Sequence, residues 1–281
     1  MTSPITIVTG TSSGIGLEIA VQAAAAGHTL VATMRDTAKA GPLRDAASAL
    51  GVSVDIRTLD VTDPASIDAC FSSVLADHGR IDALVNNAGA GHVGTIENES
   101  VDDVRRVMEV NFFGVVAASK AAMPHLRESR GRLVTVTSVG GAVGQPFSEA
   151  YCAAKFAVEG FMQSLAPVAE TVGVKVSVVE PGAVASEFVP NIGLSSADMV
   201  AQAGPYAPAL GAYLARSGSS FANAQSSTDA AAAIVAVLTA DSPPLRAQTS
   251  DGARAFVGAS LADTDGSAVL GLTRTWVAGQ P

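Results

Sequence analysis

The sequence is poor in basic residues, cysteine and histidine, and each shortage excludes a class of protein. Lys and Arg number 17 against 26 Asp and Glu, a net charge of −9, so no positive excess exists to bind nucleic acid or anionic lipid. The two cysteines, Cys70 and Cys152, form no C-x-x-C motif or disulfide framework, which favours a reducing compartment. The four histidines show no metal-ligand spacing, so we expect no metal site.

Long hydrophobic runs are also missing, although hydrophobic residues make up 48% of the 281 residues. The best candidate, Ala230 to Ala240, lies between two aspartates and is far shorter than the about 18 residues that a membrane span needs. The first Lys or Arg is Arg35, so the early basic region of a secretory signal is not found. We therefore expect a cytoplasmic globular protein with a large core.

Six short runs rich in β-branched residues alternate with helical segments, a pattern that predicts a parallel sheet covered by helices on both faces. No linker or internal repeat divides the first 180 residues, so we expect a single domain, residues 1–281, rather than the two that the length allows. The predicted fold is α/β with a doubly wound, Rossmann-type sheet. The predicted strands are Ile5–Val8, Thr29–Ala32, Val52–Leu59, Ala83–Asn86, Leu133–Thr137 and Lys175–Val179.

Two predicted helices contain a proline, which removes a backbone donor and should interrupt them. The segment Val101 to Glu128 is expected to end or kink at Pro124, and the helix that starts at Tyr151 to end or kink near Pro167. This second helix is apolar on nearly all sides, so it must be buried on more than one side.

From Ser186 onward glycine, serine, alanine and proline become frequent between scattered apolar residues. A long segment of this kind is either functional or a loosely packed connection, and the sequence leaves both alternatives open. We interpret residues 186–226 as a mobile lid over the substrate and residues 241–281 as a C-terminal extension.

A glycine-rich turn joins the first predicted strand to an apolar helix, with the sequence Thr9-Gly10-Thr11-Ser12-Ser13-Gly14-Ile15-Gly16. Glycines here allow close approach of the backbone, and free N–H groups at the helix N-terminus can face a pyrophosphate. The spacing is G-x-x-x-G-x-G rather than G-x-G-x-x-G, so glycines required by turn geometry alone are the alternative.

A second group of residues is suited to acid–base chemistry. Tyr151 and Lys155 are four apart on a predicted helix and share one face, and an ammonium beside a phenol lowers the phenol pKa from about 10. Ser138 follows a predicted strand at the edge where α/β sheets bind ligands, and its hydroxyl can hydrogen-bond a reacting oxygen. Together they can exchange a proton with a carbonyl or alcohol oxygen.

These motifs resemble, in order and spacing, the short-chain dehydrogenase/reductase (SDR) family over residues 5–240, and residues 138–160 resemble its 17β-hydroxysteroid dehydrogenase type 1 and retinol dehydrogenase branch. The resemblance implies an NAD(P)(H)-dependent oxidoreductase that transfers a hydride between nicotinamide and a hydrophobic ketone or secondary alcohol, steroid-like, retinoid-like or polyketide-like. The matching motifs are Thr9–Gly16, Asn86-Asn87-Ala88-Gly89, Asn111, Ser138, Tyr151-x-x-x-Lys155 and Pro181-Gly182.

The resemblance also implies roles for single residues. Tyr151 is the acid/base, Ser138 binds the reacting oxygen, and Asn111 holds a water that links Lys155 to solvent. Ser186 stands where the family commonly has threonine and keeps the hydroxyl. The cofactor-binding residues implied are Gly10, Ser12, Ser13, Gly14, Ile15, Gly16, Arg35, Asp60, Val61, Asn87, Ala88, Gly89, Tyr151, Lys155, Pro181, Gly182, Val184 and Ser186.

The choice of cofactor depends on the end of the second strand, where an acid binds a ribose 2′-hydroxyl and an arginine accepts a 2′-phosphate. Met34 stands where the acid is usual, and Arg35 follows it. Ser12 and Ser13 are also in reach of a phosphate, so we expect NADP(H) to be preferred over NAD(H). Asp36 is the counter-evidence, because a solvated Arg35–Asp36 pair is the alternative.

The expected partners are a hydrophobic small molecule and a second copy of the chain. The substrate pocket is expected from residues 90–93, 140–147 and 183–188 and from the later covering segment, which are mainly apolar. Related enzymes pack the two long helices against a twofold mate, which implies a homodimer or homotetramer. A non-catalytic dinucleotide-binding redox sensor on the same fold is the alternative function, and the presence of all four catalytic residue types disfavours it.

Overall fold

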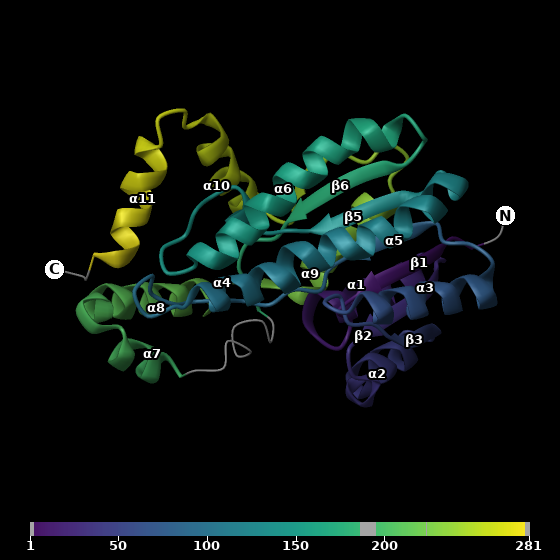
Figure 1. Ribbon diagram of the computed structural model, residues 1–281, viewed down its shortest axis with the longest axis horizontal. Helices are drawn as coiled ribbons and strands as arrows, with labels where there is room; N and C mark the ends of the chain where they lie inside the picture. The colour runs from purple at the N-terminus through teal and green to yellow at the C-terminus, as the bar shows by residue number, and fades with distance from the viewer. Residues whose placement is uncertain (1–2, 186–194, 223, 279–281) are drawn as a thin grey trace.

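A seven-stranded parallel sheet forms the centre of the protein, in the order β3-β2-β1-β4-β5-β6-β9 (Figure 1). The computed structural model describes residues 3–185, 195–222 and 224–278. The strand order reverses between β1 and β4, so the sheet is doubly wound in a single domain, as predicted. The strands are β1 Ile5–Thr9, β2 Thr29–Met34, β3 Val54–Thr58, β4 Ala83–Asn86, β5 Arg132–Val136, β6 Lys175–Glu180 and β9 Arg246–Gln248.

Helices cover both faces of the sheet and form two separate hydrophobic cores. One core joins the sheet to α1 Gly14–Ala25, α2 Gly41–Ala49 and α9 Ser227–Thr239. The other core joins it to α3 Pro64–His78, α5 Gly114–Ser129 and α6 Glu149–Glu170. Strands covered on both sides need no alternation of polar and apolar residues, which is why the central strands read as continuous apolar runs.

The ends of α3 show how local sequence sets helix boundaries. The Asp63 carboxylate accepts a hydrogen bond from the N–H of Ala65, and Pro64 follows at the first helical position. Gly79 ends the helix in the left-handed conformation, with φ of 74°.

The prolines lie within helices rather than at their ends. Pro124 lies inside α5 and Pro167 inside α6, and both helices continue beyond them. Both prolines are exposed, so the carbonyls they leave unbonded can reach water. The predicted helix from Val101 to Glu128 is instead interrupted before Pro124, where a π-helical turn at Glu109–Phe113 separates α4 Val101–Met108 from α5. The alternative that the helices end at Pro124 and Pro167 is therefore wrong, and a kink at either proline stays a prediction.

Four helices of the second half gather at the end of the molecule toward which the strand arrows point (Figure 1). They are α7 Ser196–Gln202, α8 Ala207–Ala222, α10 Asp251–Ala262 and α11 Ser267–Val277. Two short strands, β7 Val184–Ala185 and β8 Gln225–Ser226, pair nearby. Within the described ranges no helix has both the length and the apolar character to cross a membrane.

Candidate active site

A cavity of about 1160 Å³ lies at the carboxyl ends of the strands, lined by residues that directly follow β1, β4, β5 and β6. All but one of the predicted cofactor-binding residues line it; the exception, Ser186, is outside the described residues. Ser138, Tyr151 and Lys155 line it too, whereas Asn111 is fully buried behind the wall. The structure thus brings together a set of residues that is scattered along the sequence.

The glycine-rich turn packs against the segment after β4. A Cβ on Gly16 would lie 2.1 Å from the carbonyl oxygen of Gly10 and 2.3 Å from Nδ2 of Asn87, so only glycine fits there. The Asn87 amide holds the turn by donating to the carbonyl oxygens of Thr9 and Gly10, at 2.9 and 3.0 Å.

The N-terminus of α1 faces the same cavity. Ser13, its N-cap residue, makes no side-chain capping hydrogen bond among the described residues, so the first N–H groups of the helix remain available. Ser13, Gly14 and Ile15 all line the cavity. An uncapped helix N-terminus beside a glycine turn fits the pyrophosphate of a dinucleotide.

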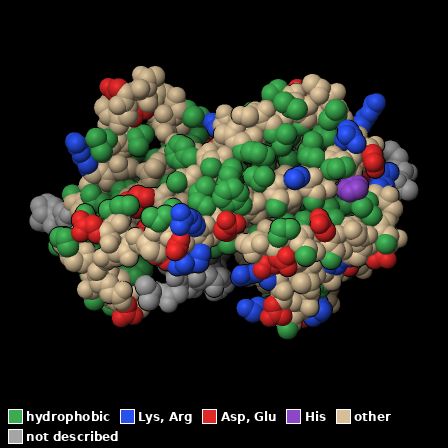
Figure 2. Space-filling model, in the orientation of Figure 1, with side chains coloured by type: hydrophobic (Ala, Val, Ile, Leu, Met, Phe, Trp, Pro, Cys, Tyr) green, Lys and Arg blue, Asp and Glu red, His purple; other side chains and the backbone are tan. Residues whose placement is uncertain are grey.

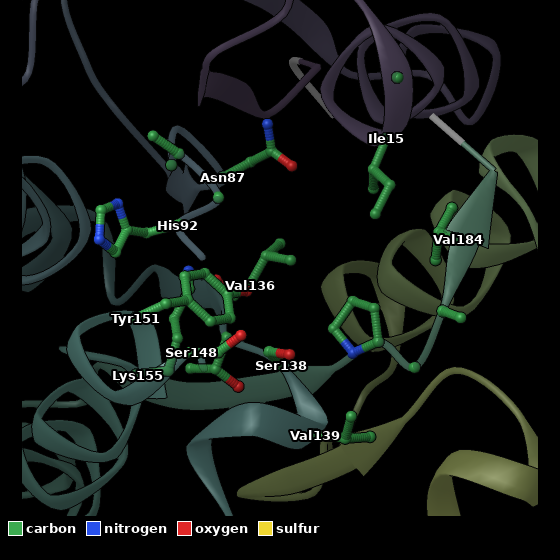
Figure 3. A pocket seen from close by; sticks show the side chains of 18 of the residues that line it. Ile15, Asn87, His92, Val136, Ser138, Val139, Ser148, Tyr151, Lys155 and Val184 are labelled. Atoms are coloured by element: carbon green, nitrogen blue, oxygen red, sulfur yellow. The ribbon is translucent and has the colours of Figure 1, made fainter. Parts of the chain in front are cut away.

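Ser138, Tyr151 and Lys155 form one wall of the cavity, with Ile15 and Val184 across from them (Figure 3). Ser138 caps the 3₁₀ turn Val139–Gly141 after β5, and its side chain hydrogen-bonds Tyr151. The Lys155 ammonium lies 5.7 Å from the centre of the Tyr151 ring and donates to the carbonyl oxygen of Val136 at 3.3 Å. The three polar groups thus converge on one place.

Residues 4–196 match the family described as short chain dehydrogenase. The chain belongs to this family. Retinol dehydrogenase 8 of Bos taurus is 39% identical over 271 residues, which cover 93% of this chain and 86% of that protein. Estradiol 17-beta-dehydrogenase 1 of Rattus norvegicus is 42% identical over 195 residues, covering 67% of this chain and 56% of that protein. Both lie in the branch that the sequence predicts.

Solved structures of this family share the fold. A short-chain dehydrogenase from Streptomyces avermitilis has a TM-score of 0.77 at 30% identity, covering 97% of this chain and 98% of that chain. A short chain dehydrogenase/reductase from Burkholderia phymatum, solved in complex with NAD, has a TM-score of 0.78 at 22% identity, covering 93% of this chain and 94% of that chain. At this identity the likeness supports the fold and nothing further. The family is one of oxidoreductases that use nicotinamide dinucleotides.

In this short chain dehydrogenase, burial dominates the ionisation of Tyr151 and Lys155. Burial raises the pKa of Tyr151 above its ordinary value, and the hydrogen bond with Ser138 only partly opposes the rise. Burial lowers the pKa of Lys155 to about 8, against the opposing effect of the Glu159 carboxylate. The expectation that the Tyr151 pKa lies below its ordinary value is therefore wrong for the protein by itself. Both side chains are buried, and burial disfavours the charged form of each.

Asn111 lies in the π-helical turn between α4 and α5, a local distortion often found at functional sites. Its amide donates to the carbonyl oxygens of Ala90 and Val107 at 3.0 and 3.1 Å. A Cβ on Gly89 would lie 2.9 Å from Oδ1 of Asn111 and 3.6 Å from Nζ of Lys155, so both groups border the same glycine. The structure thus places Asn111 near Lys155, while its role in a proton relay stays a prediction.

Arg35 and Asp36 have separate environments. Arg35 lines the cavity with an exposed side chain. The Asp36 carboxylate accepts the N–H of Ala38 at 3.0 Å and so caps the 3₁₀ turn Thr37–Lys39. In the described part of the chain, no ion pair joins the two.

The outer wall contains residues that the sequence did not single out. Of the predicted pocket segments, residues 90–93, Gln145 and residues 183–184 line the cavity. Residues 140–144, 146, 147 and 185 do not, and 186–188 lie outside the described residues. The C-terminal extension contributes directly, through α10 and α11. No periodicity or motif marks these side chains, because helices distant in sequence bring them to the wall. Met199 and Tyr213 lie in the predicted lid, residues 186–226, whereas the sequence did not single out the lining residues Ser148, Ala253, Phe256 and Trp276.

Proposed function

We propose that the protein is an NADP(H)-preferring oxidoreductase that interconverts a hydrophobic ketone and its secondary alcohol, with Tyr151 as the acid/base. The observation that carries the proposal is the convergence of Ser138, Tyr151 and Lys155 on one wall of the cavity that the glycine turn also lines. The dinucleotide-binding half and the acid–base half of the site therefore share one space.

The residues have distinct tasks in this proposal. A bound nicotinamide dinucleotide supplies the hydride, which no side chain can provide. The hydroxyls of Ser138 and Tyr151 bind the substrate oxygen, and in the reductive direction Tyr151 donates its phenolic proton to that oxygen. The Lys155 ammonium stabilises the phenolate that remains. Because burial raises the pKa of Tyr151, the phenol is protonated before the reaction, and release of its proton depends on stabilisation of the phenolate by Lys155.

The preference for NADP(H) is supported by the Arg35 and Asp36 environments. Asp36 is engaged in capping a turn, whereas Arg35 faces the cavity and is available to a 2′-phosphate. Asp60, the acid among the predicted cofactor residues, accepts hydrogen bonds from the N–H and hydroxyl of Thr62 at 2.9 and 2.8 Å. NAD(H) is the alternative cofactor.

The substrate class is inferred from the walls of the cavity. Apolar side chains from α7, α8, α10 and α11 line the cavity together with Arg216 and serines of α7 and α8, and this mainly apolar wall suits a hydrophobic ketone or alcohol. We keep residues 186–226 as the proposed lid, of which α7 and α8 are within the described residues. A steroid-like, retinoid-like or polyketide-like molecule is the class to test first.

A homodimer or homotetramer is supported by apolar side chains on the surface of the two long helices. Phe113, next to α5, is 50% exposed and Phe156 on α6 is 45% exposed. Hydrophobic side chains gather over these helices in the space-filling view (Figure 2). Burial of such a face against a second copy would remove it from water.

The test is a panel of ketones and alcohols followed by nicotinamide absorbance, with NADP(H) and NAD(H) in parallel. Wild type should turn over hydrophobic substrates, and Tyr151→Phe should lose turnover while cofactor binding, measured by fluorescence, stays within a few-fold. Unchanged turnover in Tyr151→Phe contradicts the mechanism. Cofactor binding by wild type without turnover on any substrate would favour the redox sensor instead.

A further inference from the structure

A third ionisable residue follows Tyr151 and Lys155 along α6. Glu159 is one turn beyond Lys155, so the three residues repeat at intervals of four and share a helix face. Glu159 is 3% exposed and Lys155 is 4% exposed. Burial of a carboxylate destabilises the folded protein unless other groups compensate its charge. The role of Glu159 therefore follows from the groups that it contacts.

Glu159 is held at both of its carboxylate oxygens. The hydroxyl of Thr137 donates to Oε1 at 2.6 Å, and Nη2 of Arg246 donates to Oε2 at 3.1 Å. Thr137 directly precedes Ser138, so this hydrogen bond links the end of β5 to the helix that carries Tyr151 and Lys155. Arg246 comes from β9, the strand that sequence analysis missed.

Arg246 also binds a second buried acid. Its Nε lies 3.2 Å from Oε1 of Glu180, which is fully buried, and Nε2 of Gln248 donates to the other Glu180 oxygen at 2.6 Å. Glu180 directly precedes Pro181, which lines the cavity. The cluster therefore joins the carboxyl ends of β5 and β6 to α6 through β9.

The charges of this cluster include Lys155. Burial raises the pKa of Glu180 to about 7, so above this pH two carboxylates face the single guanidinium of Arg246. The Lys155 ammonium, one turn along α6 from Glu159, then balances the charge. Lys155 shares its helix face with the titratable groups Tyr151 and Glu159, and the cluster that holds Glu159 also contains Glu180 on β6 and Arg246 on β9.

We propose that Glu159 is a positioning residue of the reaction: its anchored carboxylate keeps Lys155 as the ammonium and holds the Ser138 end of β5 against α6. This inference rests on the proposed function. The turn after β5 packs closely against this part of α6, as a positioning role requires. A Cβ on Gly141 would lie 3.0 Å from Cγ of Glu159 and 3.1 Å from the carbonyl oxygen of Lys155. Ion pairs of this kind are a poor source of stability compared with apolar residues, so a positioning role is a physical reason for their presence.

Burial and the Glu159 carboxylate shift the pKa of Lys155 in opposite directions. Burial lowers the pKa of Lys155 to about 8, and Glu159 raises it. Removing the carboxylate lowers the pKa of Lys155 further, because a nearby negative charge favours protons on its neighbours. The alkaline limb of the reduction, where Lys155 loses its proton, should then move to lower pH.

The test is Glu159→Gln, which keeps the shape and removes the charge, with Glu170→Gln on the exposed end of the same helix as the matched control. We expect kcat for reduction to fall at least tenfold at pH 7.5 and the alkaline limb to move down by one pH unit or more, while Glu170→Gln matches wild type. Glu159→Asp, which keeps the charge, should restore the position of the limb. A folded Glu159→Gln protein with the wild-type limb and turnover overturns the proposal.

Two further measurements test the role of Glu159 if Glu159→Gln turns over no substrate or does not fold. The pKa of Lys155 in the protein without cofactor is read from the pH dependence of its acylation by acetic anhydride, followed by peptide mass spectrometry. This value should fall in Glu159→Gln even if no substrate is turned over, which separates this inference from the proposed function. If Glu159→Gln does not fold, Thr137→Val removes the anchor and keeps the charge: kcat should fall with KM unchanged, and an unchanged kcat overturns the proposal.

Discussion

The hydroxyl oxygens of Ser148 and Tyr213 lie 3.2 Å apart, joining the loop before α6 to α8 within the proposed lid. Both side chains line the cavity and are almost fully buried. The Tyr213 ring also packs on Phe147, with ring centres 5.6 Å apart. Phe147 has a positive φ of 59°, which is uncommon for a bulky residue, so this contact is made by a constrained backbone. The position of α8 is thereby coupled to the segment that carries Tyr151.

Tyr213→Phe removes the hydrogen bond and keeps the ring. We expect KM for a bulky substrate to rise several-fold with little change in kcat, and the free energy of unfolding to fall by about 1 kcal/mol. Tyr206→Phe is the control, because the Tyr206 hydroxyl donates to Glu97 at an exposed position that does not line the cavity. Steady-state kinetics and urea denaturation measure the two effects, and equal KM changes in both variants would contradict the role of Tyr213.

Gly16→Ala should disrupt the cofactor site. The added Cβ would lie 2.1 Å from the carbonyl oxygen of Gly10, so the turn must move away from α1. We expect cofactor affinity to fall at least 100-fold and stability by about 2–4 kcal/mol, measured by fluorescence titration and thermal unfolding. Gly258→Ala on α10, where a Cβ meets nothing within 4 Å, should be neutral or stabilising.

Arg35→Ala tests the cofactor preference. Loss of one charge-assisted hydrogen bond, about 1.5–3 kcal/mol, should lower kcat/KM for NADP(H) by about tenfold or more and leave that for NAD(H) almost unchanged. Arg44→Ala on α2 removes an exposed arginine that does not line the cavity and serves as the control. A wild-type enzyme with a clear kcat/KM advantage for NAD(H) would refute the preference.

The pH dependence of reduction should reflect Lys155. Burial lowers its pKa to about 8, so the ammonium is present below this pH and is lost as the pH rises through it. Because the ammonium stabilises the Tyr151 phenolate, kcat/KM for ketone reduction should be level near pH 7 and decline above about pH 8. A rate profile from pH 6 to 10 at constant ionic strength measures this, and a profile still level at pH 10 would be inconsistent with it.

Phe156→Glu tests the proposed interface between copies of the chain. A carboxylate in a face that is buried on association is unfavourable without a partner, so we expect the variant to dissociate toward monomers. Sedimentation velocity at micromolar concentration measures the change against wild type. Leu50→Glu provides the control, because Leu50 is 56% exposed at the end of α2 on the opposite side of the sheet. A wild-type protein that is entirely monomeric contradicts the interface itself.

The strands, the glycine turn and the pairing of Tyr151 with Lys155 were all predictable from the sequence, because each depends on local geometry. β-branched runs form strands, and residues four apart share a helix face whatever surrounds them. The exception among the strands of the central sheet is β9, whose three residues, Arg-Ala-Gln, carry no such signal and pair only because β6 offers an open edge.

Only the tertiary structure decided the electrostatics of the site and the make-up of its outer wall. Helical spacing places Lys155 beside Tyr151, but burial, which depends on the whole fold, determines that the Tyr151 pKa rises rather than falls. Arg246 reaches Glu159 across 87 positions of sequence, and α10 and α11 close the cavity from the far end of the chain. Local backbone preferences are encoded residue by residue, whereas desolvation and contacts between distant segments arise only when the chain has folded around them.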